Sequence, residues 1–301
     1  MTPFYEALVE RDLVSARAEG AGLHGDQLFL AVTRFALLAY APSQHAKHAL
    51  LACLAAREAG APEAVMIECA LYAATARQPW SEPPVLDPPA DDDAASEGFA
   101  DRGAAERWLA RRWRRDDFAR HYFGEAVHDF EDLGHSLIVS SAAWRLAALL
   151  GEQGRYAVLR TGAWEMAAHR GDRYEETGVA LTVETLAARA IDACAAACGE
   201  IAATHAIFLL DAALECGDDD ALRRVCDYLT MTVPPTDPQP SAPMPPLVPY
   251  ELARDYAATL KAHAVARRWQ ARFPSIDVAR FVAAVDWNRI HGPSFEEWSF
   301  A

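Results

Sequence analysis

The chain has 301 residues, of which 52% are hydrophobic, and its formal net charge is -15 at pH 7, with a pI near 5.1. This apolar content is enough for a sizeable buried core, but the length alone leaves open whether the chain forms one domain or two. The acidic balance argues against a nucleic-acid interface and against attachment to anionic lipid through basic residues.

The N-terminal segment MTPFYEALVERDL predicts a cytoplasmic protein. It carries acidic residues where a signal peptide needs a basic region and an apolar stretch, and we expect no run long enough to span a membrane. The six cysteines lie in segments rich in Ala and Leu, without a CxxC motif or the spacing of a zinc finger. We expect them to be reduced, buried and structural.

Apolar residues recur at i, i+3, i+4 and i+7 along nearly the whole chain, and Ala and Leu dominate where a sheet would show alternating Val, Ile and Thr. The predicted fold class is therefore all-α. The expected helices run from about 4 to 18, 26 to 40, 44 to 59, 62 to 77, 103 to 113, 116 to 131, 136 to 150, 154 to 169, 178 to 198, 200 to 216, 218 to 231, 250 to 272 and 275 to 287.

Two proline-rich segments interrupt this pattern, at Gln78 to Gly98 and at Val233 to Pro249. Proline excludes regular helix in both. Because the flanking helices have the same character, we expect a single domain over residues 1–301 with irregular loops at about 78–100 and 233–249. The second loop is either a passive connection or a cover that borders the active site.

Three apolar helices open with histidine and end at a glycine 12 to 16 residues later, each followed by a second helix. Their sequences are HAKHALLACLAAREAG from His45, HSLIVSSAAWRLAALLG from His135 and HAIFLLDAALECG from His205. The recurrence predicts helical hairpins that present imidazoles from equivalent ends, around a central histidine-lined pocket.

A histidine at a helix N-terminus is held in the neutral form by the helix dipole, and neutral imidazole is the form that binds metal. His45 and His48 lie three positions apart, so they point within roughly 60° of each other and can share an ion. With His135 and His205 they supply four nitrogen ligands for iron, zinc or copper. The alternative is that each histidine is an ordinary hydrogen-bonded polar group.

Other motifs in the chain are weaker. Gly20 to Gly25 matches GxGxxG without the strand that gives this motif its meaning, and Glu125 to His128 is an ExxH without the partners of a di-iron site. The arginine-rich run from Arg107 to Phe123 also contains acidic residues, which favours a solvated pair of helices over a nucleic-acid strip.

Four stretches in chain order resemble the questin oxidase-like family. SQHAKHALLACLAAREAG is similar to the histidine signature near that family's start, and GHSLIVSSAAWRLAALLGEQGRYAVLRTGAWEMA is similar to its central histidine segment. IAATHAIFLLDAAL resembles its later His-Ala segment, and LKAHAVARRWQARFPSIDVARFVAAV resembles its closing helix with a lysine.

The resemblance implies an oxygenase that acts on an aromatic polyketide such as an anthraquinone, with non-haem Fe(II) in a histidine-rich pocket and dioxygen as co-substrate. It implies His45, His48, His135, His205 and Lys261 as the metal-site residues. Lys261 is either carboxylated, which would give it an anionic oxygen ligand, or an ordinary solvent-facing side chain. His263 on the same helix is an alternative ligand or a partner of one.

Two alternatives to this function stay open. The first is an NADPH-dependent Baeyer-Villiger-type monooxygenase, for which no flavin or haem signature is present in the sequence. The second is a non-enzymatic α-helical repeat scaffold whose histidines are incidental. For an enzyme, we expect Trp144, Trp164 and Phe208 either to line the substrate pocket or to pack in the core.

Overall fold

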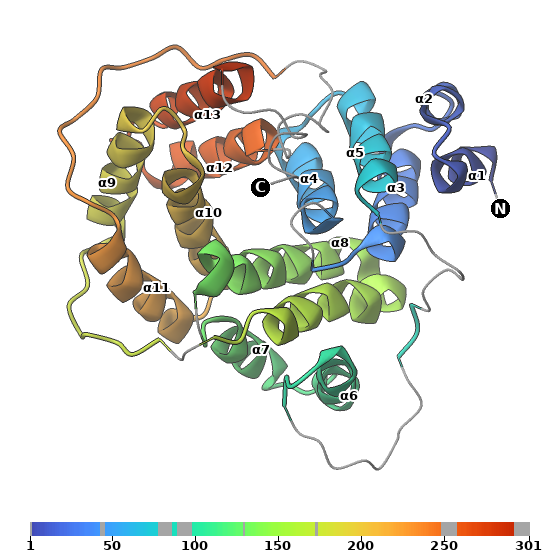
Figure 1. The fold of residues 1–301 in the computed structure, drawn as a ribbon, viewed down its shortest axis with the longest axis horizontal. Helices are drawn as coiled ribbons and strands as arrows, with labels where there is room; N and C mark the ends of the chain where they lie inside the picture. The colour runs from blue at the N-terminus through green and yellow to red at the C-terminus, as the bar shows by residue number, and fades with distance from the viewer. Residues whose placement is uncertain are drawn as a thin grey trace. The chain divides into compact units, whose positions relative to one another are not determined.

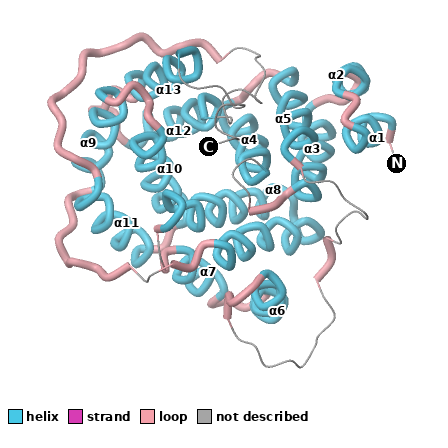
Figure 2. Tube along the Cα trace, viewed as in Figure 1, coloured by secondary structure: helices cyan, strands magenta, loops and turns pink. Residues whose placement is uncertain are grey.

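The computed structural model describes residues 2–42, 46–77, 86–88, 98–128, 130–171, 174–247 and 258–291. Every regular element in these ranges is a helix, and none is a strand (Figures 1 and 2). The all-α prediction is confirmed. The chain divides into two compact units, unit 1 (residues 1–85, 242–274 and 282–301) and unit 2 (residues 86–241 and 275–281). The prediction that they form one domain stays a prediction.

Unit 1 is built around a helix that is buried on all sides. Its helices are α1 (Pro3–Glu10), α2 (Leu13–Gly20), α3 (Gly25–Ala39), α4 (Ala46–Ala59), α5 (Glu63–Ala76), α12 (Ala258–Arg272) and most of α13 (Ala279–His291). Every residue of α4 from Ala46 to Ala56 is buried, and α4 packs against α3, α5 and α12. A helix that is apolar all round belongs in the interior, and its many alanines allow three neighbours to approach closely.

Unit 2 contains α6 (Arg102–Arg112), α7 (Phe118–Ala126), α8 (Glu131–Ala168), α9 (Val183–Ala196), α10 (Ile201–Cys216) and α11 (Asp219–Thr232). α8 packs against α6, α7 and α10, and α10 also packs against α9 and α11. Histidines at the starts of α8 and α10 therefore belong to neighbouring helices.

α8 is a hairpin of two helical arms rather than one rod, as Figure 1 shows. Gly151 interrupts it with φ 69° and ψ -169°, a conformation that a residue with a side chain avoids. The arms then run back along each other, and Gly162 of the second arm faces Ser140 of the first. The expected helices 136–150 and 154–169, with Gly151 as a stop, are confirmed.

The expected single helix from about 4 to 18 is wrong, because the chain breaks at Arg11. This residue is in the left-handed conformation at φ 60°, and the side chain of Asp12 then accepts a hydrogen bond from the Ser15 backbone at 3.0 Å. Asp12 caps a new helix, α2. Asp12 is a residue type that favours the start of a helix, so the sequence does contain a signal for the break. The apolar spacing continues across it and predicted one helix instead.

Both expected loops are irregular where the structure describes them. Residues 233–247 form no helix, and neither do Leu86–Pro88 and Gly98. The rest of both loops, like Ser43 and His45, lies outside the described residues.

The cysteines follow the prediction with one exception. Five are buried, whereas Cys198 is exposed beyond the end of α9. All six are free thiols, and burial raises the pKa of Cys194 to about 11. The prediction that Cys198 is buried is wrong, since α9 ends before the residue that would continue its apolar face.

One segment of the described chain, Glu131–Glu152, has the length and apolar character of a membrane-crossing helix, contrary to expectation. However, 67% of its most apolar window is buried inside the protein, which is typical of the core helix of a soluble protein. A cytoplasmic location stays a prediction.

We predict that Gly162→Ala destabilises unit 2 severely. An added Cβ would lie 1.9 Å from the Tyr122 hydroxyl and 2.7 Å from Ser140 Oγ, and Tyr122 is held in place because it donates to the Leu159 carbonyl at 2.9 Å. Overpacking of this kind costs about 3 kcal/mol, measured as the free energy of unfolding in urea. Gly124→Ala in α7 is the control, because nothing lies within 4 Å of its added Cβ. An equal stability of the two variants would contradict the close packing of the α8 arms.

A second prediction concerns Asp227 on α11, which is 2% exposed. Its carboxylate accepts hydrogen bonds from Thr177 and Val179, and these bonds attach the segment that precedes α9 to helix α11. Burial raises the pKa of its carboxyl, but hydrogen bonds donated by Tyr174, by Thr177 and by the Val179 backbone outweigh burial and lower the pKa from 3.8 to about 2. A depressed folded-state pKa stabilises the fold above pH 4, and this contribution is lost as the pH falls from about 4 to about 2.

Asp227→Asn should therefore reduce the free energy of unfolding at pH 7 by about 2 kcal/mol. The asparagine amide has one oxygen in place of two, and its NH₂ group would face the N–H and O–H groups that now donate to the carboxylate. The deficit relative to the wild type should shrink as the pH approaches 2. A deficit that stays constant from pH 7 to pH 2 would refute the electrostatic origin.

Candidate functional site

Two of the predicted histidines meet in unit 2. The ring centroids of His135, on α8, and His205, on α10, lie 4.8 Å apart, and the ring planes are inclined by 49°. The two residues are only 3% and 9% exposed. We call them the histidine pair.

The backbone before His135 makes this approach possible. Asp132, Leu133 and Gly134 all have positive φ angles, so the regular helix of α8 begins at the histidine. A Cβ at Gly134 would lie 2.7 Å from Leu209 Cδ1, one turn after His205 on α10. Glycine therefore serves two needs here, because it adopts the left-handed conformation and lets α8 approach α10 closely.

Hydrogen bonds fix the orientation of both imidazoles. His135 Nδ1 lies 2.5 Å from the Asp132 carbonyl oxygen, and His205 Nδ1 lies 2.8 Å from the Ile201 carbonyl oxygen. A carbonyl only accepts hydrogen bonds, so each Nδ1 carries the proton and donates it. Each neutral ring then has its lone pair on Nε2, and both Nε2 atoms are buried. This is how proteins orient a histidine that binds metal.

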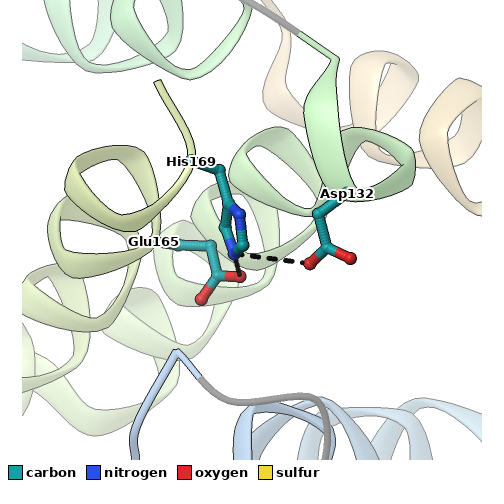
Figure 3. Close-up of side chains that lie close together, drawn as sticks. All are labelled: Asp132, Glu165 and His169. Carbon is teal, nitrogen blue, oxygen red and sulfur yellow. Dashed lines mark ion pairs between the residues drawn. The ribbon is translucent and has the colours of Figure 1, made fainter. Parts of the chain in front are cut away.

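A second group of ligand-type side chains lies at the open end of the α8 hairpin (Figure 3). His169 Nε2 is 3.3 Å from Glu165 Oε1 and 3.4 Å from Asp132 Oδ2, and the three donor atoms all lie within 4.8 Å of one another. The Glu165 side chain is fully buried, whereas those of His169 and Asp132 are 20% and 30% exposed. We call these residues the carboxylate–histidine triad.

Asp132 connects the two groups. Its Oδ2 atom lies 3.4 Å from His135 Nδ1 as well as 3.4 Å from His169 Nε2. The histidine pair and the triad are therefore neighbouring parts of one polar cluster within unit 2.

The sequence reasoning missed the triad. Glu165 and His169 stand at i, i+4 on one helix face, a spacing that the sequence shows directly. Asp132 is far from them in sequence and reaches them only because α8 reverses at Gly151. The i, i+4 spacing was the available signal.

A cavity of about 470 Å³ lies beside His205. Its walls are mainly apolar, with Leu133, Leu209 and Tyr228 among them, and a few polar groups. The lining also includes Val233, Pro234 and Thr236, so the second loop borders this cavity. That the loop borders an active site stays a prediction.

The three aromatic residues expected to line a pocket do not line this cavity. Trp144 packs against Phe118 and Phe123, and Trp164 donates its indole hydrogen to Glu106 at 3.0 Å. Phe208 lies behind His205, with ring centroids 5.7 Å apart. All three residues therefore contact other side chains of unit 2 rather than the cavity.

His48 and Lys261 meet in unit 1, on α4 and α12. Lys261 Nζ lies 3.1 Å from His48 Nδ1, and each residue is 7% exposed. If the ammonium of Lys261 donates to Nδ1, the proton of a neutral His48 is on Nε2, which then has no lone pair for a metal. Ligation through Nε2 of His48 therefore requires that Lys261 Nζ does not donate to Nδ1.

The chain has two lysines among its 28 basic residues, Lys47 and Lys261, and both are buried. Arginine provides every other positive side chain apart from histidine, so lysine is used here only in the interior of unit 1. The sequence itself shows this restriction of lysine to two positions.

His263 is half-buried, and burial lowers its pKa more than Asp286 raises it, so it is neutral at pH 7.

The structure thus places the predicted metal-site residues in two groups. His135 and His205 meet in unit 2, and His48 and Lys261 meet in unit 1, while His45 lies outside the described residues. That all five share one ion stays a prediction.

No protein-family model, curated protein or solved structure matches the chain. The resemblance to questin oxidase-like proteins is therefore untested.

We predict that Lys261, which the resemblance places at the metal site, is carboxylated in the metal-loaded protein. Protein prepared in ¹³C-bicarbonate should show a carbamate carbon signal by NMR, and Lys261→Met should abolish it. Lys47→Arg is the control, because the chain has no third lysine side chain. A signal that survives in Lys261→Met, or its absence from the wild type, would contradict the prediction.

Proposed function

We propose that the protein is an oxygenase that holds non-haem Fe(II) and oxidises or cleaves the ring of a small aromatic polyketide. The observation that supports this most directly is the histidine pair, two buried imidazoles with oriented Nε2 atoms, one of which lines an apolar cavity. A binding scaffold with incidental histidines has no need to bury and orient two of them together.

The donor set fits such an ion. Neutral imidazole suits iron, and imidazoles with a nearby carboxylate are typical of non-haem iron oxygenases. His135 and His205 would hold the ion through Nε2, and Asp132 faces the opposite edge of the His135 ring. A bound Fe(II) would supply the one-electron chemistry with dioxygen that protein side chains lack.

The remaining residues of the site bind and shield the substrate. The cavity volume is in the range of pockets for small ligands, and its apolar walls suit a planar aromatic molecule. Tyr228 offers an aromatic surface, and Glu200 and Thr232 offer oxygen atoms that can accept a hydrogen bond from a phenol hydroxyl. The loop residues Val233 and Pro234 cover one side and reduce access of water.

Electron balance separates this function from its enzymatic alternative. A ring-cleaving dioxygenase inserts both oxygen atoms into the substrate and consumes no other reductant. A Baeyer-Villiger monooxygenase inserts one atom and reduces the other to water, which takes two electrons from NADPH and two protons. Among the residues that the structure describes, the lining of the cavity contains no arginine or lysine to bind a nucleotide phosphate, which favours the first reaction.

The test uses protein purified without oxygen, with iron content and oxygen uptake measured on an anthraquinone-like substrate. We expect His135→Ala and His205→Ala each to reduce turnover, and the affinity for the iron held by the histidine pair, by about 100-fold or more, since each removes a ligand. His121→Ala is the control, because His121 is 41% exposed on the same unit. Full turnover in His135→Ala and His205→Ala would refute the proposal, and uptake that requires stoichiometric NADPH would favour the monooxygenase.

A further inference from the structure

The carboxylate–histidine triad has the chemistry of a metal site in its own right. It combines two carboxylates and one imidazole, the ligands that Zn²⁺ and related divalent ions take in sites with three protein ligands and a water. His169 and Asp132 are partly exposed, so a water molecule can reach the fourth position. We propose that Asp132, Glu165 and His169 bind a divalent transition-metal ion such as Zn²⁺, separately from the histidine pair.

The distances within the triad match those between neighbouring ligands of one metal ion. In an ordinary hydrogen bond, an N–H donor and a carboxylate oxygen lie roughly 2.7 to 3.2 Å apart, most often about 2.9 Å. Here His169 Nε2 is 3.3 Å and 3.4 Å from its two carboxylate oxygens. Ligand bonds of about 2.0 to 2.2 Å in a tetrahedral site place neighbouring donor atoms about 3.3 to 3.6 Å apart. The imidazole therefore already has the ligand spacing with both carboxylates.

Charge points in the same direction. With a neutral imidazole the triad carries two negative charges, and the carboxylate of Glu165 is fully buried. Two carboxylates held within 4.8 Å of each other repel in an environment of low dielectric constant. A divalent ion placed between the two carboxylates reduces this repulsion.

The triad is also built on rigid elements. Glu165 and His169 are one turn apart at the end of the second α8 arm, and Asp132 precedes the first arm in its left-handed segment. The packing of Gly162 against Tyr122 and Ser140 fixes the two arms relative to each other. The three ligands therefore keep their spacing without an ion, which lowers the entropic cost of binding one.

The experiment measures metal binding rather than activity, so it does not depend on the proposed oxygenase. Metal-free protein is titrated with Co²⁺, whose visible absorption reports tetrahedral coordination, and with Zn²⁺ by calorimetry. The starting protein carries His205→Ala, which removes one ligand of the histidine pair and keeps His135, whose Nδ1 donates to the Asp132 carbonyl. We expect about one equivalent of ion to bind to this protein through the triad.

Adding Glu165→Gln or His169→Gln should weaken this binding by about 100-fold or more, because each removes a ligand. Two variants are used because Glu165 is fully buried, and circular dichroism checks that each remains folded. Asp117→Asn is the matched control. Asp117 and His121 form an exposed i, i+4 pair at 3.2 Å with the same residue types but no third ligand.

The proposal is overturned if neither Glu165→Gln nor His169→Gln changes Co²⁺ or Zn²⁺ binding, or if the starting protein binds no ion. The oxygenase proposal fails on a different result, since it requires that intact protein binds a further ion through His135 and His205. The two failures are therefore distinguishable in the same set of titrations.

Discussion

The reversal of α8 at Gly151 is the constraint on which the site in unit 2 depends. Because the two arms run back along each other, residues near the two ends of α8 meet, and these ends carry Asp132 and His169. The arms can approach this closely because Gly162 leaves room for the Tyr122 hydroxyl and for Ser140. A side chain at that position would separate the arms and, with them, Asp132 from Glu165 and His169.

The elements of this fold could be predicted from the sequence because they are set by local chemistry. Apolar spacing and abundant Ala and Leu predicted the helices, and Gly151 predicted the break in α8. The exception at Arg11 has a local cause too, since Asp12 competes as a helix cap within an otherwise continuous apolar pattern. How the helices associate is not local, so neither the two units nor the contact of Gly162 on α8 with Tyr122 on α7 was predictable from periodicity.

The same distinction explains what was found of the site. His135 and His205 were identified because each begins an apolar helix, and the structure brings them together because Gly134 allows α8 to approach α10. The role of Asp132 depends on its left-handed backbone and on a partner 37 residues away, His169 (169 minus 132). No spacing rule for helices covers such a pair. Lys261 came only from a family resemblance, although the scarcity of lysine was a physical reason to single it out.

Asp132 contacts both the histidine pair and the carboxylate–histidine triad. Its carbonyl oxygen accepts the Nδ1 proton of His135 and so sets which nitrogen of that ring can bind a metal, while its carboxylate faces His169. A residue inside a regular helix could not do both, because its carbonyl would point along the helix axis to the residue four positions on. The three consecutive left-handed residues from Asp132 to Gly134 free that carbonyl, at a backbone cost of about 1 to 3 kcal/mol for each non-glycine residue. Such a cost persists only where surrounding contacts hold the conformation, and here these contacts include the hydrogen bond from His135 to the Asp132 carbonyl and the close approach of Gly134 to Leu209 on α10.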